Sequence, residues 1–250
     1  MGYHESLTEG RNAVLEAFRS GKTVDRLFVL DGCQDGPVKT ILREAKKQDT
    51  MVQYVKKERL DQLSETKNHQ GVIAYCAACE YAEVSDILEN AKKKGEAPFI
   101  VLLDGIEDPH NLGAIIRTAN QAGAHGVIIP KRRVVSVNST VNKASAGAVE
   151  HMKIARVTNI SDAIEELKQA GLWVCGTAVD TNKYYYNQDL TGPLAIVIGN
   201  EGKGIGEKVK KNCDFLVKIP MKGKVQSLNA SVSTGIVVYE AVKQRIRKEN

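Results

Sequence analysis

Short apolar runs separated by polar turns set the strongest limit on the fold of this chain. In the second part of the chain they cover residues 99–105, 126–130, 172–180, 194–199 and 215–220. Continuous apolar runs of this length are typical of strands that are buried on both faces of a parallel sheet. Amphipathic helical spacing lies between them, at residues 112–122, 160–170 and 205–211. This alternation predicts a doubly wound α/β domain.

The first part of the chain predicts a smaller α/β unit. We expect strands at 26–30, 52–55 and 71–75 and helices at 7–20 and 37–47. A further helical stretch within residues 79–98 ends in three lysines and Gly95, which is a common signal for a helix C-terminus. We therefore expect a first domain at 1–77, a linker at 78–96 and a second domain at 97–250.

Composition narrows the class of protein. The 250 residues carry a net charge of +5 at pH 7, which permits nucleic acid as a partner without requiring it. We expect a cytoplasmic protein without membrane contact, because neither a spanning run nor the apolar core of a signal peptide is visible. The five cysteines are an odd number, so a disulfide framework is not expected. Cys76 and Cys79 form a lone CxxC pair, and we expect no metal site.

Arg117 stands out in the helix expected at 112–122. The apolar side of that helix consists of Leu112, Ile115, Ile116, Ala119 and Ala122, and Arg117 points away from it. An arginine in this position is usually a solvated surface charge. Gly113 lies one turn earlier on the outward side, and a helical glycine costs about 1 kcal/mol relative to alanine, so we expect a close approach there. His110 and His125, at the two ends of the segment, are expected as capping or surface residues.

Polar groups follow three of the expected strands, at the edge where open parallel sheets bind ligands. These groups are Asn111 and Arg117 after 99–105, Asn200 and Glu201 after 194–199, and Ser227 and Asn229 after 215–220. The glycine-rich turn GKGIGE does not match the dinucleotide fingerprint, and the chain has neither a phosphate loop nor a hydrolase nucleophile elbow. Dehydrogenases, NTPases and hydrolases are therefore disfavoured.

Three ordered segments carry a family resemblance: DPHNLGAIIRTANQAGAHGVII, LAIVIGNEGKGI and IPMKGKVQSLNASVSTGIVVYEA. They resemble the motifs of the SpoU (TrmH) family of the SPOUT superfamily, which are RNA ribose 2′-O-methyltransferases that use S-adenosylmethionine. GRNAV at 10–14 and HQGVIA at 69–74 resemble the small ribosomal-protein-like (L30e-like) RNA-binding domain of the subgroup that acts on 23S ribosomal RNA. The resemblance implies a SPOUT-type parallel sheet with a C-terminal deep trefoil knot within about 194–240, and a homodimer.

The resemblance also implies a site. The expected cofactor-binding residues are Thr177, Ala178, Gly199, Asn200, Ile219 and Leu228, and the expected catalytic residues are Arg117, Asn111, Glu201, Ser227 and Asn229. RNA contacts are expected from Arg117, Lys131, Arg132, Arg133, Lys222 and Lys224. An arginine is not normally deprotonated in a protein, so we prefer Arg117 as a phosphate clamp over Arg117 as a free base. Asn111 could equally be a helix N-cap, and each basic cluster a solvated face.

The function that follows is methylation of the ribose 2′-OH of a guanosine in 23S ribosomal RNA. Three alternatives stay open on the sequence. A tRNA guanosine 2′-O-methyltransferase shares all three motifs. A non-catalytic RNA-binding protein could keep the knot. A nucleotide-dependent oxidoreductase has the same general α/β pattern.

Overall fold

The computed structural model describes residues 7–77, 79–132, 134–225 and 227–249. The chain divides into two compact units, Met1–Glu80 with Ser136–Ser139 and Tyr81–Val135 with Thr140–Asn250. No helix in the described part combines the length and the apolar character needed to cross a membrane.

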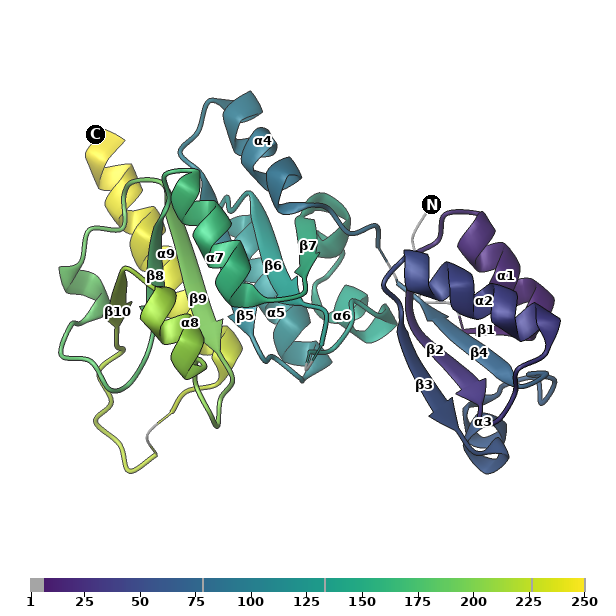
Figure 1. Cartoon of the computed structure of the whole chain (residues 1–250). Helices are drawn as coiled ribbons and strands as arrows, with labels where there is room; N and C mark the ends of the chain where they lie inside the picture. The colour runs from purple at the N-terminus through teal and green to yellow at the C-terminus, as the bar shows by residue number, and fades with distance from the viewer. Residues whose placement is uncertain (1–6, 78, 133, 226, 250) are drawn as a thin grey trace. The chain divides into compact units, whose positions relative to one another are not determined.

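The first unit is a four-stranded sheet with helices on both faces (Figure 1). Its strands are β1 (Leu7–Glu9), β2 (Val24–Leu30), β3 (Met51–Val55) and β4 (Val72–Cys76), in the order β1-β4-β2-β3, and only β2 and β3 are parallel. Helices α1 (Arg11–Arg19) and α2 (Gly36–Lys47) cover one face, while α3 (Lys57–Leu63) packs Leu60 against Phe28 and Ile73 on the other.

The start of this unit corrects one prediction. The helix expected at 7–20 is divided, because Leu7–Glu9 pairs with β4 as an edge strand and the helix begins only at Arg11. Gly10 lies between the two with φ +86°, a left-handed conformation that glycine adopts without steric cost. The short helix α3 was not predicted, since a single buried apolar residue gives it almost no periodic signal.

The second unit is a doubly wound domain with a six-stranded, all-parallel sheet, as predicted. Its strands are β5 (Phe99–Asp104), β6 (Gly126–Pro130), β7 (Lys153–Val157), β8 (Trp173–Thr177), β9 (Leu194–Gly199) and β10 (Phe215–Val217), in the order β10-β8-β9-β5-β6-β7. The edge strand β7 was not predicted, because its two basic residues interrupt the apolar run.

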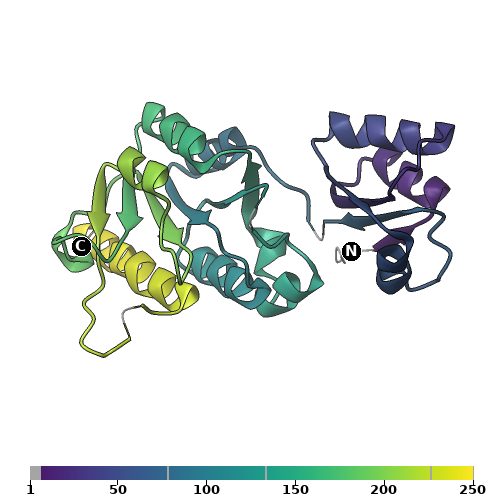
Figure 2. The same ribbon diagram turned by 60° about the horizontal axis from the view of Figure 1, so that its bottom comes forward.

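Helices cover both faces of this sheet (Figures 1 and 2). One face carries α4 (Val84–Lys94), α7 (Ile160–Gln169) and α8 (Glu207–Asn212), and the other carries α5 (Pro109–Gln121) and α9 (Ala230–Glu249). The short helices α6 (Ser139–Ala144), η1 (Ala148–His151) and η2 (Tyr185–Asn187) lie in the connections. Both faces of the central strands are therefore shielded from solvent, which explains their continuous apolar sequence.

The prediction of a linker at 78–96 is wrong, because most of this segment forms the helix α4, which belongs to the second unit. Val84 and Ile87 of this helix are buried in the core of the second unit, and Gly126 leaves room for Ile87, whose side chain would lie 2.5 Å from a Cβ at that position. The helix ends at Gly95 in the left-handed conformation, after three lysines, as the sequence indicated.

Gly113 is buried by the protein's own chain, so the expected close approach is confirmed and its expected place on the outward side of the helix is corrected. A Cβ at this position would lie 2.5 Å from the Cβ of Ala144 and 2.7 Å from the carbonyl oxygen of Val141. The glycine therefore allows α5 and α6 to pack backbone against backbone. Fully buried Ser145 belongs to the same contact, since its amide nitrogen would lie 2.9 Å from that Cβ.

His125 is buried rather than a capping or surface residue. Its Nδ1 accepts a hydrogen bond from the backbone N–H of Phe99 at 3.0 Å, so the ring proton resides on Nε2 and faces Glu96 at 3.1 Å. Arg245 of α9 lies over the ring of Phe99, 4.4 Å from its centroid. Burial lowers the pKa of His125 below its usual value, and Lys94 and Arg245 act in the same direction against the carboxylate of Glu96.

This arrangement predicts a stability loss at mildly acidic pH. In the unfolded chain the pKa of His125 returns to about 6.5, so below that pH the unfolded state binds more protons than the folded state. The free energy of unfolding should then fall with decreasing pH by up to about 1.4 kcal/mol per pH unit. Urea unfolding between about pH 7.5 and about pH 5.5 should show this fall, and His125→Gln should be less stable but less pH-dependent. An equal pH dependence in both proteins would contradict the assignment.

Candidate functional site

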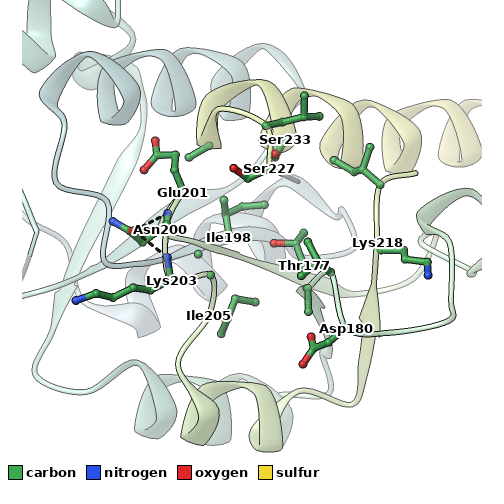
Figure 3. A pocket seen from close by; sticks show the side chains of 18 of the residues that line it. Thr177, Asp180, Ile198, Asn200, Glu201, Lys203, Ile205, Lys218, Ser227 and Ser233 are labelled. Carbon is green, nitrogen blue, oxygen red and sulfur yellow. Dashed lines mark hydrogen bonds between the residues drawn. The ribbon is translucent and has the colours of Figure 1, made fainter. Parts of the chain in front are cut away.

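A cavity of about 470 Å³ opens at the carboxyl edge of the sheet of the second unit. The segments that follow β8, β9 and β10 line it, as Figure 3 shows for Thr177, Asn200 and Lys218. Eight of the residues predicted from sequence meet there: Thr177, Ala178, Gly199, Asn200, Glu201, Ile219, Ser227 and Leu228. Ligands of open parallel sheets bind at this edge, so the cavity is the candidate site.

The glycine-rich turn after β9 forms one wall and is held by Asn200. The Oδ1 of Asn200 accepts from the backbone N–H groups of Gly202 at 2.9 Å and Lys203 at 3.3 Å (Figure 3). Its Nδ2 donates to the carbonyl of Gly105 at 3.0 Å. The turn also folds back on its strand, because a Cβ on Gly199 would lie only 2.2 Å from the backbone of Gly204. Asn200 thus acts by shaping the wall, and only glycine fits at position 199.

Three polar side chains from distant parts of the chain form a directed series of hydrogen bonds beside the cavity. Asn111 Nδ2 donates to Oε1 of Glu201, and Asn229 Nδ2 donates to Oδ1 of Asn111 at 2.8 Å. The Oδ1 of Asn229 accepts from the N–H of Ser231 at 2.9 Å and thereby caps α9. A carboxylate can only accept and a helix N-terminus can only donate, so the two ends impose the same direction on both amides.

The structure assigns the capping role at α5 to a different residue from the one considered in the sequence. Oδ1 of Asp108 accepts from the N–H of His110 at 3.0 Å, so Asp108 is the N-cap. Asn111 lies inside the first turn, 9% exposed, with its amide turned toward Glu201 and Asn229. Its side chain therefore serves the site and not the helix end.

Arg117 lies on the exposed side of α5 and does not line the cavity. Within the described residues its guanidinium makes neither a hydrogen bond nor an ion pair. Leu112, Ile115, Ile116 and Ala119 of the same helix are fully buried, which confirms the predicted apolar side. The guanidinium of Arg117 is therefore exposed on α5, and its N–H groups can donate to an anion.

The other basic residues predicted to contact RNA are spread over the second unit. Arg132, Lys222 and Lys224 are exposed, and Arg133 lies outside the described residues. Lys131 lines a second cavity of about 380 Å³ together with Arg156, Glu83, Asp162 and Glu166. That cavity has mixed charge and offers no focused site for a phosphate.

Sequence reasoning missed several charged residues at the main cavity. Lys218 lies at its rim because β10 ends at Val217, whereas the apolar run had predicted a strand to 220. Lys210 of α8 pairs with Asp180 at 3.0 Å, and this hydrogen bond lowers the pKa of the Asp180 carboxyl. The predicted strands run past the ends of β8 and β10, and so they hid Asp180 and Lys218.

The walls combine apolar side chains with unpaired backbone groups. Ile198, Ile219 and Leu228 provide the apolar surface. Within the described part of the chain, the N–H groups of Ile219 and Leu228 have no hydrogen-bond acceptor. A concave, mostly apolar site with a few fixed polar groups suits a small ligand with a flat ring and polar ends.

Comparison with known proteins matches the two parts of the chain to two family models. Residues 98–239 match the model of the SpoU rRNA methylase family, and residues 7–82 match the RNA 2′-O ribose methyltransferase substrate-binding family. A relative from Bacillus subtilis (strain 168), which carries the provisional name of a TrmH family tRNA/rRNA methyltransferase, is 49% identical over 94% of this chain and 94% of its own length.

Solved structures give the same result. The SpoU methyltransferase AviRb of Streptomyces viridochromogenes, in complex with its cofactor AdoMet, is 27% identical, with a TM-score of 0.62 over 98% of this chain and 92% of its own. The AdoMet-bound rRNA methyltransferase of Sinorhizobium meliloti is 28% identical, with a TM-score of 0.60 over 95% of this chain and 86% of its own. The chain therefore belongs to the SpoU rRNA methylase family, whose members use S-adenosylmethionine, and is an RNA methyltransferase.

Proposed function

We propose that this protein methylates the ribose 2′-OH of a guanosine in 23S ribosomal RNA, with S-adenosylmethionine as the methyl donor. The observation that carries the proposal is the cavity at the carboxyl edge of the sheet with the Glu201–Asn111–Asn229 series beside it. Its volume of about 470 Å³ lies in the usual range for cofactor sites.

The residues of the cavity fit the methyl donor. The apolar side chains of Ile198, Ile219 and Leu228 provide flat surfaces for an adenine ring, and the unpaired N–H groups of Ile219 and Leu228 can donate to its nitrogens. Thr177, Ala178 and Gly199 form the remaining backbone walls. When bound, S-adenosylmethionine supplies a methyl group that its sulfonium makes electrophilic.

The residues around the cavity position the RNA. Arg117 clamps a phosphate next to the attacking hydroxyl, and that phosphate accepts the hydroxyl proton, since an arginine keeps its own proton. The series of Glu201, Asn111 and Asn229 holds the turn after β9 and the start of α9 in fixed positions, and Ser227 offers a hydroxyl at the cavity. Alignment of this kind contributes several kcal/mol to methyl transfer.

The first unit supports ribosomal RNA over tRNA as the substrate. The match of residues 7–82 to a substrate-binding family supports a role of the small α/β unit in RNA recognition, and the match of residues 98–239 to the methylase family supports catalysis by the second unit. The rRNA methyltransferase of S. meliloti covers 95% of this chain, whereas the TrmH/SpoU tRNA modifying enzyme of A. aeolicus covers 66%. A ribosomal substrate supports the proposed cytoplasmic location.

The path of the C-terminal segment supports the proposed trefoil knot. After β9 the chain forms α8 on one face of the sheet and then β10, which lies beyond β8 at the edge. It then returns to α9, which packs on the face opposite α8 (Figure 2). Both passages border the cavity. In a knotted chain, the cavity walls are held by the topology in addition to the hydrogen bonds.

An apolar stripe on α9 supports the proposed homodimer. Val232, Tyr239 and Ile246 are spaced by seven residues, and their exposed fractions are 50%, 48% and 53%. This spacing places them on one side of the helix, and exposed apolar patches of this kind mark interfaces. Sedimentation equilibrium should give twice the chain mass of 27.3 kDa, and a monomer would reject the dimer.

Methyl transfer from labelled S-adenosylmethionine to unmodified 23S ribosomal RNA and, in parallel, to unmodified tRNA tests the function. A 2′-O-methylguanosine mapped in the ribosomal RNA is the expected product. Transfer to tRNA alone would keep the chemistry and reject the substrate. Cofactor binding without transfer to either RNA would point to a missing partner or a different RNA substrate. Failure to bind S-adenosylmethionine would favour a non-catalytic RNA-binding protein.

Arg117→Ala should lower kcat/KM for the RNA by about 10²- to 10³-fold, because the phosphate loses its charged clamp. The affinity for S-adenosylhomocysteine should stay unchanged, since the arginine does not line the cavity. Arg117→Lys should recover part of the activity, because the lysine ammonium keeps the positive charge but cannot bind the phosphate with two parallel hydrogen bonds as a guanidinium does. Full activity of Arg117→Ala would remove this residue from the reaction.

Gly199→Ala should abolish cofactor binding, because its Cβ would collide with the backbone of Gly204 and displace the wall of the cavity. Gly202→Ala is the matched control in the same turn, since the nearest atom to a Cβ there lies at 3.5 Å. Isothermal titration with S-adenosylhomocysteine measures both. Equal affinities in the two variants would contradict the assigned wall.

A further inference from the structure

An aromatic cluster in the segment between β8 and β9 has no part in the reaction described above. It consists of the consecutive residues Tyr184, Tyr185 and Tyr186. The rings of Tyr184 and Tyr186 are stacked, 5.4 Å apart and 4° from parallel, and the ring of Tyr185 meets that of Tyr186 edge to face at 5.0 Å. Tyr186 is 44% exposed, and within the described residues none of the three hydroxyl groups makes a hydrogen bond.

The backbone holds this cluster firmly against the sheet. Lys218 donates from its N–H to the carbonyl of Lys183 at 2.9 Å and accepts at its own carbonyl from the N–H of Tyr185 at 3.2 Å. The segment therefore extends the edge of the sheet beyond β10. Behind the cluster, the side chain of Gln244 accepts from the N–H of Leu190 at 2.9 Å and so ties the segment to α9. The rings are thus ordered before any ligand arrives.

Positive charge borders the rings and connects them to the methyl-donor cavity. The ammonium of Lys218 lies over the ring of Tyr184, 5.2 Å from its centroid, and Lys218 also lines the cavity. Figure 3 shows Lys218 on the side of the cavity away from Glu201. Exposed Lys183 directly precedes the cluster. Stacked aromatic rings beside cations are the chemistry that binds unpaired nucleobases and their phosphates.

We propose that Tyr184, Tyr185 and Tyr186, together with Lys183 and Lys218, form a stacking platform for an unpaired base of the RNA substrate. The base adds to the stack on the exposed ring of Tyr186, and the lysines contact the phosphates of the same strand. The proposal rests on the proposed function, because RNA must reach the neighbouring cavity. It adds a requirement that the nucleotides beside the target are single-stranded.

Charge and ring geometry favour RNA over a protein partner at this surface. The cores of protein interfaces are depleted in lysine, whereas Lys183 and Lys218 border this cluster. Stacking on an aromatic face also tolerates any base, so the platform needs no particular sequence. It would select unpaired RNA over duplex RNA, whose bases are already stacked.

Binding of a short fluorescein-labelled single-stranded RNA, in the presence of S-adenosylhomocysteine, tests the platform with the full chain. Tyr186→Ala should weaken this binding by about 5- to 100-fold, and Tyr186→Phe should leave it nearly unchanged. Binding of the same sequence as a duplex should not differ between wild type and Tyr186→Ala. Trp173→Ala is the matched control, because Trp173 is 62% exposed and begins β8, so it lies at the amino-terminal end of the strand whose other end borders the cavity.

The possible results separate the platform from the proposed function. Unchanged RNA binding by Tyr186→Ala, in an enzyme that methylates ribosomal RNA, would overturn the platform alone. An altered molecular mass or a lost affinity for S-adenosylhomocysteine in this variant would assign the cluster to a subunit interface or to the cavity wall, which also overturns it. A wild-type chain that binds the cofactor but neither binds nor methylates RNA would overturn the proposed function and the platform with it.

Discussion

The site depends on a directed series of hydrogen bonds that joins three segments far apart in the chain. Glu201 follows β9, Asn111 lies in the first turn of α5, and Asn229 precedes and caps α9. The carboxylate at one end and the helix N-terminus at the other fix the direction of both amides, so each group has one orientation. Removing Glu201 or Asn229 leaves a group of the buried Asn111 amide without its partner, and such a loss costs about 1–3 kcal/mol.

Two close backbone contacts, at Gly199 and Gly113, hold the segments that carry these hydrogen bonds. Gly199 lets the turn after β9 fold back onto its own strand, and Gly113 lets α6 pack directly on α5. The two contacts leave the cavity wall and the helix of Arg117 with little freedom to move. The groups that would meet RNA, Arg117 and the rings at Tyr186, lie exposed on this rigid frame. Sites of this kind combine a fixed scaffold with free donors at the surface.

Much of the architecture could be predicted from the sequence, because buried parallel strands leave continuous apolar runs. The ends of the strands could not: β10 stops at Val217, and the apolar residues beyond it line the cavity instead of the sheet. The linker prediction failed at α4, since a short amphipathic helix near a domain boundary has the same pattern whichever core it joins. The segment Leu7–Glu9 became a strand through pairing with β4, which local propensity does not reveal.

The sequence predicted which residues gather at the candidate site, but not the contacts that hold them there. Residues from three strand ends meet at one cavity, as the topology of a parallel sheet requires. The role of Gly113 was misjudged because a helical glycine does not reveal whether protein or ligand approaches it. Asn200 shapes the turn through its side chain, a function that depends on backbone contacts absent from any spacing rule.

A crystal structure of the full chain with S-adenosylhomocysteine tests the central claim most directly. The account predicts electron density for the ligand between the segments after β8, β9 and β10, with its adenine ring against Ile219 and Leu228. Density at any other place, or a cavity that stays empty at saturating ligand, would contradict it.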